Sequence, residues 1–152
     1  MGPRIRGVKP HHLRLHQAVA RHVPLGVSIV DIGCGTGEML QRLEQMGARD
    51  LTGVDFSQVA LAVAAKRTSA RLVCADVRGY DFTGYGCAVL TEVLEHIECD
   101  ALRLPARWVA SVPNGPTVAE NHVRVYTPET VRERYGADVY QVTPTFIVFG
   151  RR

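Results

Sequence analysis

The feature that most constrains the fold is a cluster of three glycines directly after a short strand-like run. Residues 27–32 are rich in β-branched side chains, and Gly33, Gly35 and Gly37 follow at once. β-Branched runs favour buried strands, and clustered glycines favour a tight turn. Residues 39–46 then carry apolar side chains at helical spacing, and a glycine ends the pattern. This stretch therefore predicts a strand, a tight turn and a helix in succession.

The rest of the chain repeats this alternation of strands and helices. Further strands are predicted at 51–54, 72–75, 87–90, 108–112, 139–142 and 145–149, and further helices at 10–23, 57–67 and 127–135. Strands that alternate with helices form a mostly parallel sheet with helices on both faces. The sequence thus predicts a doubly wound α/β fold with a seven-stranded sheet. A chain of 152 residues fits one domain over 1–152, with 1–24 as a basic N-terminal arm and helix.

Composition narrows the class of protein. Hydrophobic residues make up 46% and charged residues 22%, which is typical of a globular domain. The chain has neither an apolar run of roughly 18 residues nor the apolar block of a secretion signal, so we expect a cytoplasmic protein without a membrane partner. The four cysteines Cys34, Cys74, Cys87 and Cys99 form no Cys-x-x-Cys pair, so each is predicted to be a small core or loop residue.

Positive charge is concentrated at the start of the chain. Residues 1–30 hold Arg4, Arg6, Lys9, Arg14 and Arg21 but no acid, although the whole chain has 18 basic and 15 acidic residues. A basic arm can bind nucleic acid, phosphate or an acidic substrate. The alternative is a solvated helix face.

Polar residues follow the predicted strands where each strand ends. Asp31, Asp55, Asp76, Glu92 and Asn114 occupy these places, whereas the strand interiors are mostly apolar. Ligands of parallel sheets bind at the carboxyl ends of the strands. One edge of the sheet is therefore the predicted site.

The glycine cluster is not a dinucleotide fingerprint. Glu38 stands where the third glycine of Gly-x-Gly-x-x-Gly would fall. Asp31 and Glu38 would repel a pyrophosphate and attract a cation. The loop thus favours a cationic ligand that approaches the backbone closely.

The next two strand ends suit a nucleoside. A carboxylate such as Asp55 can accept both hydroxyls of a ribose. Phe56 can lie against a purine face. Asp76 can accept from an exocyclic amine while the Val77 amide donates to a ring nitrogen.

These motifs together resemble the class I S-adenosylmethionine-dependent methyltransferases, and in particular their small-molecule and quinone subfamily. The matching stretches are residues 31–37, 53–57, 75–77, 92–97 and 122–129, in that order. The resemblance implies a Rossmann-like fold, S-adenosylmethionine as cofactor and methyl transfer to an oxygen, nitrogen or carbon nucleophile of a small molecule. It also implies roles in cofactor binding for ten residues: Asp31, Gly33, Cys34, Gly35 and Gly37 at the methionine portion, Asp55 at the ribose, Phe56, Asp76 and Val77 at the adenine, and Glu92 after the fourth strand.

Two histidines outside the arm, His96 and His122, are the predicted catalytic residues. Glu92, Glu95 and His96 stand at i, i+3 and i+4 and would share one face if the segment were a helical turn. With His122 they resemble the metal site of small-RNA 3′-terminal 2′-O-methyltransferases. A direct acid or base role for one histidine, a bound divalent ion and a purely structural role therefore remain open, and our prediction is catalysis by histidine without a metal.

Three functions remain in view. The first is a small-molecule methyltransferase, the second a metal-assisted RNA 2′-O-methyltransferase that uses the basic arm, and the third a non-catalytic S-adenosylmethionine-binding subunit. The segments 100–107 and 113–126 are shorter than in the family that the sequence resembles. We therefore expect an open site that takes a large substrate or is completed by a partner or by a second copy in a homodimer.

Overall fold

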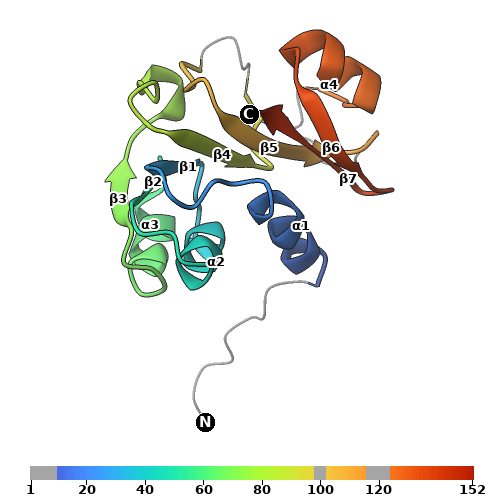
Figure 1. Ribbon diagram of the computed structural model, residues 1–152. Coiled ribbons are helices and arrows are strands. Elements are labelled where there is room, and N and C mark those ends of the chain that lie inside the picture. Colours follow the sequence, from blue (N-terminus) through green and yellow to red (C-terminus); the bar gives the residue numbers. More distant parts are fainter. Residues whose placement is uncertain (1–9, 98–101, 116–123) are drawn as a thin grey trace.

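A single mixed sheet organises the structure, a computed structural model that describes residues 10–97, 102–115 and 124–152 (Figure 1). The described strands are β1 (Ile29–Ile32), β2 (Leu51–Asp55), β3 (Arg71–Cys74), β4 (Cys87–Thr91), β5 (Trp108–Pro113), β6 (Asp138–Val142) and β7 (Phe146–Arg151). Their order is β3-β2-β1-β4-β5-β7-β6, with the first five parallel. β7 runs antiparallel to β5 and to β6. The predicted seven-stranded, mostly parallel sheet is confirmed.

Helices cover both faces of this sheet. The described helices are α1 (Pro10–Ala20), α2 (Glu38–Gln45), α3 (Gln58–Ala64) and α4 (Pro128–Tyr135), with a short 3₁₀ turn, η1, at Val77–Gly79. Figure 1 shows α1, α2 and α3 on one side of the sheet and α4 on the other. Each face has its own apolar core, one around Leu40, Leu43 and Val89 and one around Leu90, Ala110 and Phe149. The doubly wound arrangement predicted from the alternation is confirmed.

Capping residues mark the ends of two helices. The Ser57 side chain accepts a hydrogen bond from the Ala60 amide at the start of α3, and Thr127 forms a reciprocal capping box with Thr130 at the start of α4. Gly136 ends α4 in the left-handed conformation. These local signals are sufficient to set where the two helices begin.

Two helices are shorter than predicted. α1 ends at Ala20 rather than at residue 23, and α3 ends at Ala64 rather than at residue 67. At the end of α3 the amides of Lys66 and Arg67 donate to carbonyls three residues earlier, at Val63 and Ala64. This tighter bonding closes the last turn in 3₁₀ geometry and ends the α-helix.

The cysteines fit their predicted structural roles where they are described. Cys34 and Cys87 are buried, Cys74 is exposed, and Cys99 lies outside the described residues. Burial raises the pKa of the Cys87 thiol to about 11. Among the described residues, no helix has the length and apolar character that crossing a membrane requires.

Candidate functional site

Two hollows that share Gly33 lie at the carboxyl ends of the central strands. The larger is about 600 Å³ and the smaller about 160 Å³. The larger hollow is lined by Gly33, Asp55, Phe56, Asp76, Val77, Arg78, Glu92, Val93, His96 and Ile97. The smaller hollow is lined by His16, Asp31, Gly33, Cys34, Gly35, Thr36, Glu38, Met39 and Thr91. Ten of the twelve predicted site residues therefore meet at this edge. Gly37 lines neither hollow, and His122 lies outside the described residues.

The glycine loop is held against the end of β2. The amides of Gly33 and Cys34 both donate to the carbonyl of Val54. Gly33 has a φ of 70°, and a Cβ there would lie 2.8 Å from Val93 Cγ2. A side chain at this position would thus meet both backbone strain and a steric clash, so glycine is required.

Gly37 has a structural role in this arrangement. It is the N-cap of α2 with a φ of 81°, and a Cβ there would lie 2.9 Å from Ala64 Cβ. This glycine lets α2 pack closely against α3. The predicted role of Gly37 in cofactor binding stays a prediction, and its position in the structure is that of a helix cap outside both hollows.

Asp55 connects the glycine loop with the residue that precedes α3. Its Oδ2 accepts a hydrogen bond of 2.9 Å from the Gly35 amide, and its Oδ1 accepts one of 2.8 Å from the Ser57 amide. Each carboxylate oxygen has a second lone pair, so both oxygens remain able to accept from ligand hydroxyls. Asp55 therefore positions the glycine loop in addition to the role predicted for it.

Asp31 is the most strongly perturbed acid of the site. It is 2% exposed, and burial together with the nearby Asp55 carboxylate raises its pKa to about 8. The other acid of the loop, Glu38, forms an ion pair of 3.0 Å with Arg67. The sequence predicts two free negative charges, at Asp31 and Glu38. At neutral pH Asp31 is instead a neutral carboxyl and Glu38 a paired carboxylate.

The residues after β2 and β3 combine an exposed aromatic ring with a paired acid. Phe56 is 79% exposed and lines the larger hollow. The Asp76 carboxylate accepts from the Arg78 amide and makes an ion pair of 2.6 Å with the Arg78 guanidinium. These bonds to Arg78 lower the pKa of Asp76 to about 2. Asp76 thus stays ionised and also caps the short turn that carries Val77.

The segment after β4 differs from the helical turn considered above. Glu92 has a left-handed φ of 56°, and its amide donates to Ser111 on β5. A left-handed residue that is not glycine costs of order 1–3 kcal/mol and is typical of functional sites. After it, residues 93–97 form turns rather than a helix. Glu92, Glu95 and His96 consequently do not share a helical face, which corrects that expectation.

Glu95 and His96 lie in opposite environments. Glu95 is 1% exposed, and neither of its carboxylate oxygens has a hydrogen-bond partner among the residues that the structure describes, whereas His96 is 37% exposed at the larger hollow. His96 Nε2 lies 3.8 Å from Glu95 Oε1. Burial raises the pKa of Glu95 to about 8. Within the described residues, no three His, Cys, Asp or Glu side chains are grouped to hold a metal ion.

We expect the change Glu95→Met to stabilise the protein above pH 7. In the folded protein the buried Glu95 carboxyl lacks hydrogen-bond partners within the described part of the chain, and on unfolding it gains water and can ionise, which favours the unfolded state. The variant replaces this carboxyl with an apolar chain of similar length. Unfolding in urea at pH 8 is expected to show a gain of about 1–3 kcal/mol. Glu129→Met on the exposed start of α4 is the matched control and is expected to change stability by less than about 0.5 kcal/mol. A loss of stability in Glu95→Met would mean that the carboxyl supports the fold.

Eight residues that line the two hollows are not among the predicted site residues: His16, Thr36, Glu38, Met39, Arg78, Thr91, Val93 and Ile97. Seven of them lie in or beside the stretches 31–37, 75–77 and 92–97 that carry the family resemblance. His16 is the exception, because only long-range packing of α1 brings it to the smaller hollow. Burial lowers the pKa of His16.

Comparison with known proteins places this site in a family. No curated protein sequence matches the chain. Among solved structures, an S-adenosylmethionine-dependent methyltransferase from Mesorhizobium loti is 18% identical with a TM-score of 0.67, over 90% of this chain and 96% of that chain. The magnesium protoporphyrin IX methyltransferase of Synechocystis, with bound SAH, is 18% identical with a TM-score of 0.71, over 93% and 84%.

A third similar structure contains a methyl acceptor. The 1,6-didemethyltoxoflavin-N1-methyltransferase of Burkholderia thailandensis, with 1,6-didemethyltoxoflavin and S-adenosylhomocysteine bound, is 20% identical with a TM-score of 0.72, over 91% of this chain and 76% of that chain. These likenesses show the fold. The model of the methyltransferase domain family matches residues 29–112, which is more than half of the chain. This range contains the carboxyl ends of β1, β2, β3 and β4, at which the two hollows lie. The chain belongs to the methyltransferase domain family.

Proposed function

We propose that this protein transfers the methyl group of S-adenosylmethionine to a small, partly apolar acceptor. The observation that carries the proposal is the meeting of Gly33, Asp55, Val77 and Glu92, from four different strand ends, around one hollow. When bound, S-adenosylmethionine supplies an electrophilic methyl group on a sulfonium. The residues of the chain need only bind the cofactor and align an acceptor with that methyl group.

The cofactor would lie across both hollows. Asp31 and the loop of Gly33 and Gly35 suit the methionine portion, because an ionised Asp31 attracts an ammonium or a sulfonium. The second lone pairs of Asp55 suit the ribose hydroxyls. Phe56 and the Val77 turn suit the adenine, with the ionised Asp76 as acceptor for the exocyclic amine.

The acceptor side of the larger hollow indicates the substrate class. Val93 and Ile97 line it with apolar surface, and His96 provides an imidazole that is partly exposed. This combination suits a planar or aliphatic molecule that carries one ionisable O–H or N–H. Two of the similar structures are named for small planar acceptors, a porphyrin and a toxoflavin precursor.

We expect the His96→Ala variant to lose about tenfold in kcat while its affinity for S-adenosylmethionine stays within twofold. The imidazole would remove the acceptor proton as the methyl group is transferred. The expected tenfold loss in kcat is smaller than the usual contribution of a general acid or base. The reason is that an acceptor that is already partly ionised at neutral pH depends only in part on proton removal by the imidazole. The pH profile of kcat, measured beside that of His12→Ala on exposed α1, checks this: only the His96 variant should lose the acidic limb. An unchanged profile would leave His96 without a chemical role.

The same assay separates the alternatives. In the presence of a chelator, full activity supports proton transfer by His96, and loss of activity that also occurs in His122→Ala supports a bound divalent ion. Tight S-adenosylmethionine binding without turnover over a broad panel of acceptors would support a non-catalytic subunit.

The decisive test of the proposed function is calorimetry with S-adenosylmethionine and with NAD, followed by a structure with bound S-adenosylhomocysteine. The proposal requires binding of the first ligand and none of the second. It also requires the adenine against Phe56 and the sulfur facing Val93 and His96. Binding of NAD in the same hollow would overturn it.

A further inference from the structure

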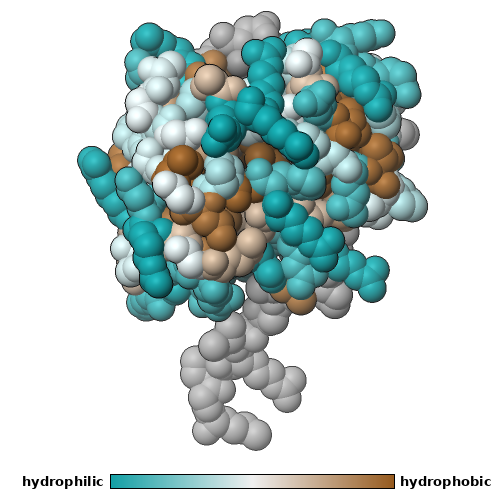
Figure 2. Space-filling model, viewed as in Figure 1, coloured by the Kyte–Doolittle hydropathy of each residue, from teal (hydrophilic) through white to brown (hydrophobic). Residues whose placement is uncertain are grey.

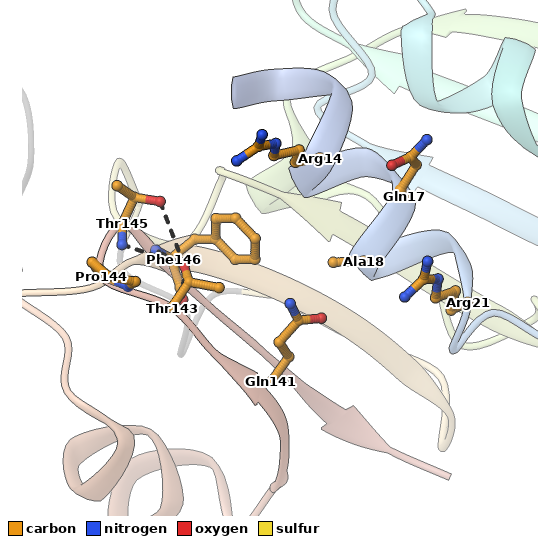
Figure 3. A pocket seen from close by; sticks show the side chains of 9 residues that line it. All are labelled: Arg14, Gln17, Ala18, Arg21, Gln141, Thr143, Pro144, Thr145 and Phe146. Carbon is orange, nitrogen blue, oxygen red and sulfur yellow. Dashed lines mark hydrogen bonds between the residues drawn. The ribbon is translucent and has the colours of Figure 1, made fainter. Parts of the chain in front are cut away.

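A second large hollow lies outside the methyl-transfer site, between α1 and the β6–β7 hairpin. Its volume is about 720 Å³. Figure 3 shows Arg14, Gln17 and Arg21 extending from α1 on one side, with the hairpin side chains on the other. Gln141 and the turn 143–146 form that second wall. The two walls are polar and basic, and the Phe146 ring lies between them.

A smaller hollow continues the first one. It measures about 350 Å³, shares Arg21, and is lined also by His22, Tyr140 and three further arginines. We call the two hollows together the basic seam, and its five arginines are Arg14, Arg21, Arg107, Arg151 and Arg152.

The basic seam runs along the strands, from the carboxyl end of β5 to its amino end. Phe146 pairs with Pro113 at the carboxyl end of β5, so the hairpin turn lies at the same edge as the cofactor hollows. Arg151 pairs with Trp108 at the other end of β5. A chain-like ligand in the basic seam would thus start near the methyl-transfer edge and run along β7. Figure 2, viewed from the same side as Figure 1, shows hydrophilic residues interspersed with apolar patches on this side of the molecule.

The charges of the basic seam are not neutralised within the described part of the chain. None of its five arginines forms an ion pair there, whereas Arg67, Arg78 and Arg103 are paired with Glu38, Asp76 and Asp81. The Arg151 guanidinium donates to the Tyr135 carbonyl at the end of α4, so the charges directed at the basic seam are those of Arg14, Arg21, Arg107 and Arg152. No Asp or Glu lines either hollow. Asp138, which begins the neighbouring β6, makes no ion pair with Arg151. The unpaired guanidinium groups repel one another, and an anionic ligand would relieve that repulsion.

The spacing of the charges favours several anionic groups in series. Arg14 lies on α1 and Arg21 directly follows this helix, with its amide donating to the Gln17 carbonyl. At the rise of an α-helix the seven positions that separate them span about 10.5 Å. Arg107, Arg151 and Arg152 follow beyond Arg21 in the second hollow. One phosphate group cannot bridge this length, whereas a phosphodiester chain presents charges along it.

An aromatic platform accompanies the arginines. The Tyr140 ring stacks on His22 with centroids 4.4 Å apart, and the Arg152 guanidinium lies 5.3 Å from the centre of the same ring. Grooves that bind single-stranded nucleic acid combine positive charge with aromatic rings and arginine planes on which bases stack. A lipid surface needs no such concave and polar walls.

We propose that the basic seam binds a single-stranded nucleic acid. The phosphates lie along Arg14, Arg21, Arg107 and Arg152, and a base stacks on the platform that His22, Tyr140 and Arg152 form. The binding is largely sequence-tolerant, because phosphate contacts and stacking do not depend on base identity. The inference concerns binding alone and stands apart from the identity of the methyl acceptor.

The test uses the full chain and a fluorescein-labelled oligouridylate of about 12 nucleotides, followed by fluorescence anisotropy between about 50 and 200 mM salt. We expect a dissociation constant of roughly 1–100 µM. With four phosphate contacts, the logarithm of the binding constant should fall against the logarithm of salt with a slope of about −3.

Two triple variants with equal loss of charge make the test specific. R21Q/R107Q/R152Q removes three arginines of the basic seam, and R49Q/R71Q/R132Q removes three exposed arginines elsewhere. The seam variant is expected to bind at least tenfold more weakly and to lose about 2 from the salt slope, whereas the control stays within about threefold. Both variants should bind S-adenosylmethionine as the parent does, so failure here is distinguishable from failure of the proposed function.

Four results would overturn the proposal: no binding of the oligonucleotide, equal weakening in both triple variants, full displacement by about 1 mM inorganic phosphate, or preference for phosphatidylserine vesicles over the oligonucleotide. The third would indicate a single-anion site, and the fourth a membrane surface. A tyrosine variant, Tyr140→Leu, is expected to weaken binding by about fivefold or more while the salt slope stays unchanged, because stacking carries no charge.

Discussion

An Asp31→Asn variant is expected to bind S-adenosylmethionine several hundred-fold more weakly than the parent and to be more stable without it. The cationic methionine portion would face a neutral amide in a buried site, and breaking a buried charge pair costs about 3–5 kcal/mol. Calorimetry at pH 7.5 measures the affinity. Asp50→Asn, an exposed acid before β2, is the matched control and should bind as the parent does.

The stability change of Asp31→Asn follows from its raised pKa. The Asp31 carboxyl holds a proton up to about pH 8 in the folded chain and releases it near pH 4 when unfolded. Between these values the folded state binds the extra proton, so the free energy of unfolding falls as pH rises, by roughly 1.4 kcal/mol per unit at most. Stability from this group is complete at low pH and lost as pH rises through about 8.

Thermal unfolding against pH checks this sign. In a chain of this size a gain of about 1 kcal/mol in the free energy of unfolding raises Tm by roughly 2–4 °C. A gain of about 2 kcal/mol from Asp31→Asn should therefore raise Tm at pH 8 by about 4–8 °C. It should also remove part of the downward slope between pH 5 and 8, while the part due to Glu95 remains. A parent protein that becomes more stable over this range would contradict the raised pKa.

Cofactor binding to the parent should release a proton at pH 7. The arriving cation stabilises the ionised Asp31 and so lowers its pKa. Calorimetry in phosphate and in Tris, which differ in ionisation enthalpy, measures the release, and Asp31→Asn should abolish it. The affinity of the parent should accordingly increase as pH rises toward 8.

The Asp55→Ala variant is expected to weaken S-adenosylmethionine binding by at least 100-fold. Loss of a charged acceptor for the ribose hydroxyls costs about 1.5–3 kcal/mol, which is about 10- to 150-fold. The same carboxylate holds the Gly35 amide at 2.9 Å, so the variant also releases the glycine loop. The combined loss places the effect at the upper end of this range or beyond it.

Two further variants separate the contributions of Asp55. Asp55→Asn keeps an oxygen acceptor and the shape of the turn, so its loss reports the charge. Asp81→Ala removes a carboxylate that makes the same type of turn with Thr83 outside the hollow, and it should leave the affinity unchanged. Unaltered affinity in Asp55→Ala and in Asp55→Asn would exclude this residue from the cofactor site.

The sequence alone determined the fold and the position of the site. Periodicity of 2 and 3.6, clustered glycines and caps such as Ser57 and Thr127 are local signals, and each acts within a few residues. Asp31, Asp55 and Asp76 could be placed at one edge because parallel strands end on the same side of a sheet. The family motifs then fixed their order along the chain.

The tertiary structure decided the properties that depend on distant neighbours. Glu92 takes a left-handed conformation where its amide meets Ser111 on β5, so the helical face expected for Glu92, Glu95 and His96 does not form. The raised pKa of Asp31 and of Glu95 arises from burial that periodicity cannot measure. The basic seam brings Arg14 and Arg21 beside Arg107, Arg151 and Arg152, although more than 80 positions separate the two groups in the sequence. Charge composition located a basic arm near the start of the chain, but only the packing of α1 against β5 and β7 joins the two ends of the chain into one surface.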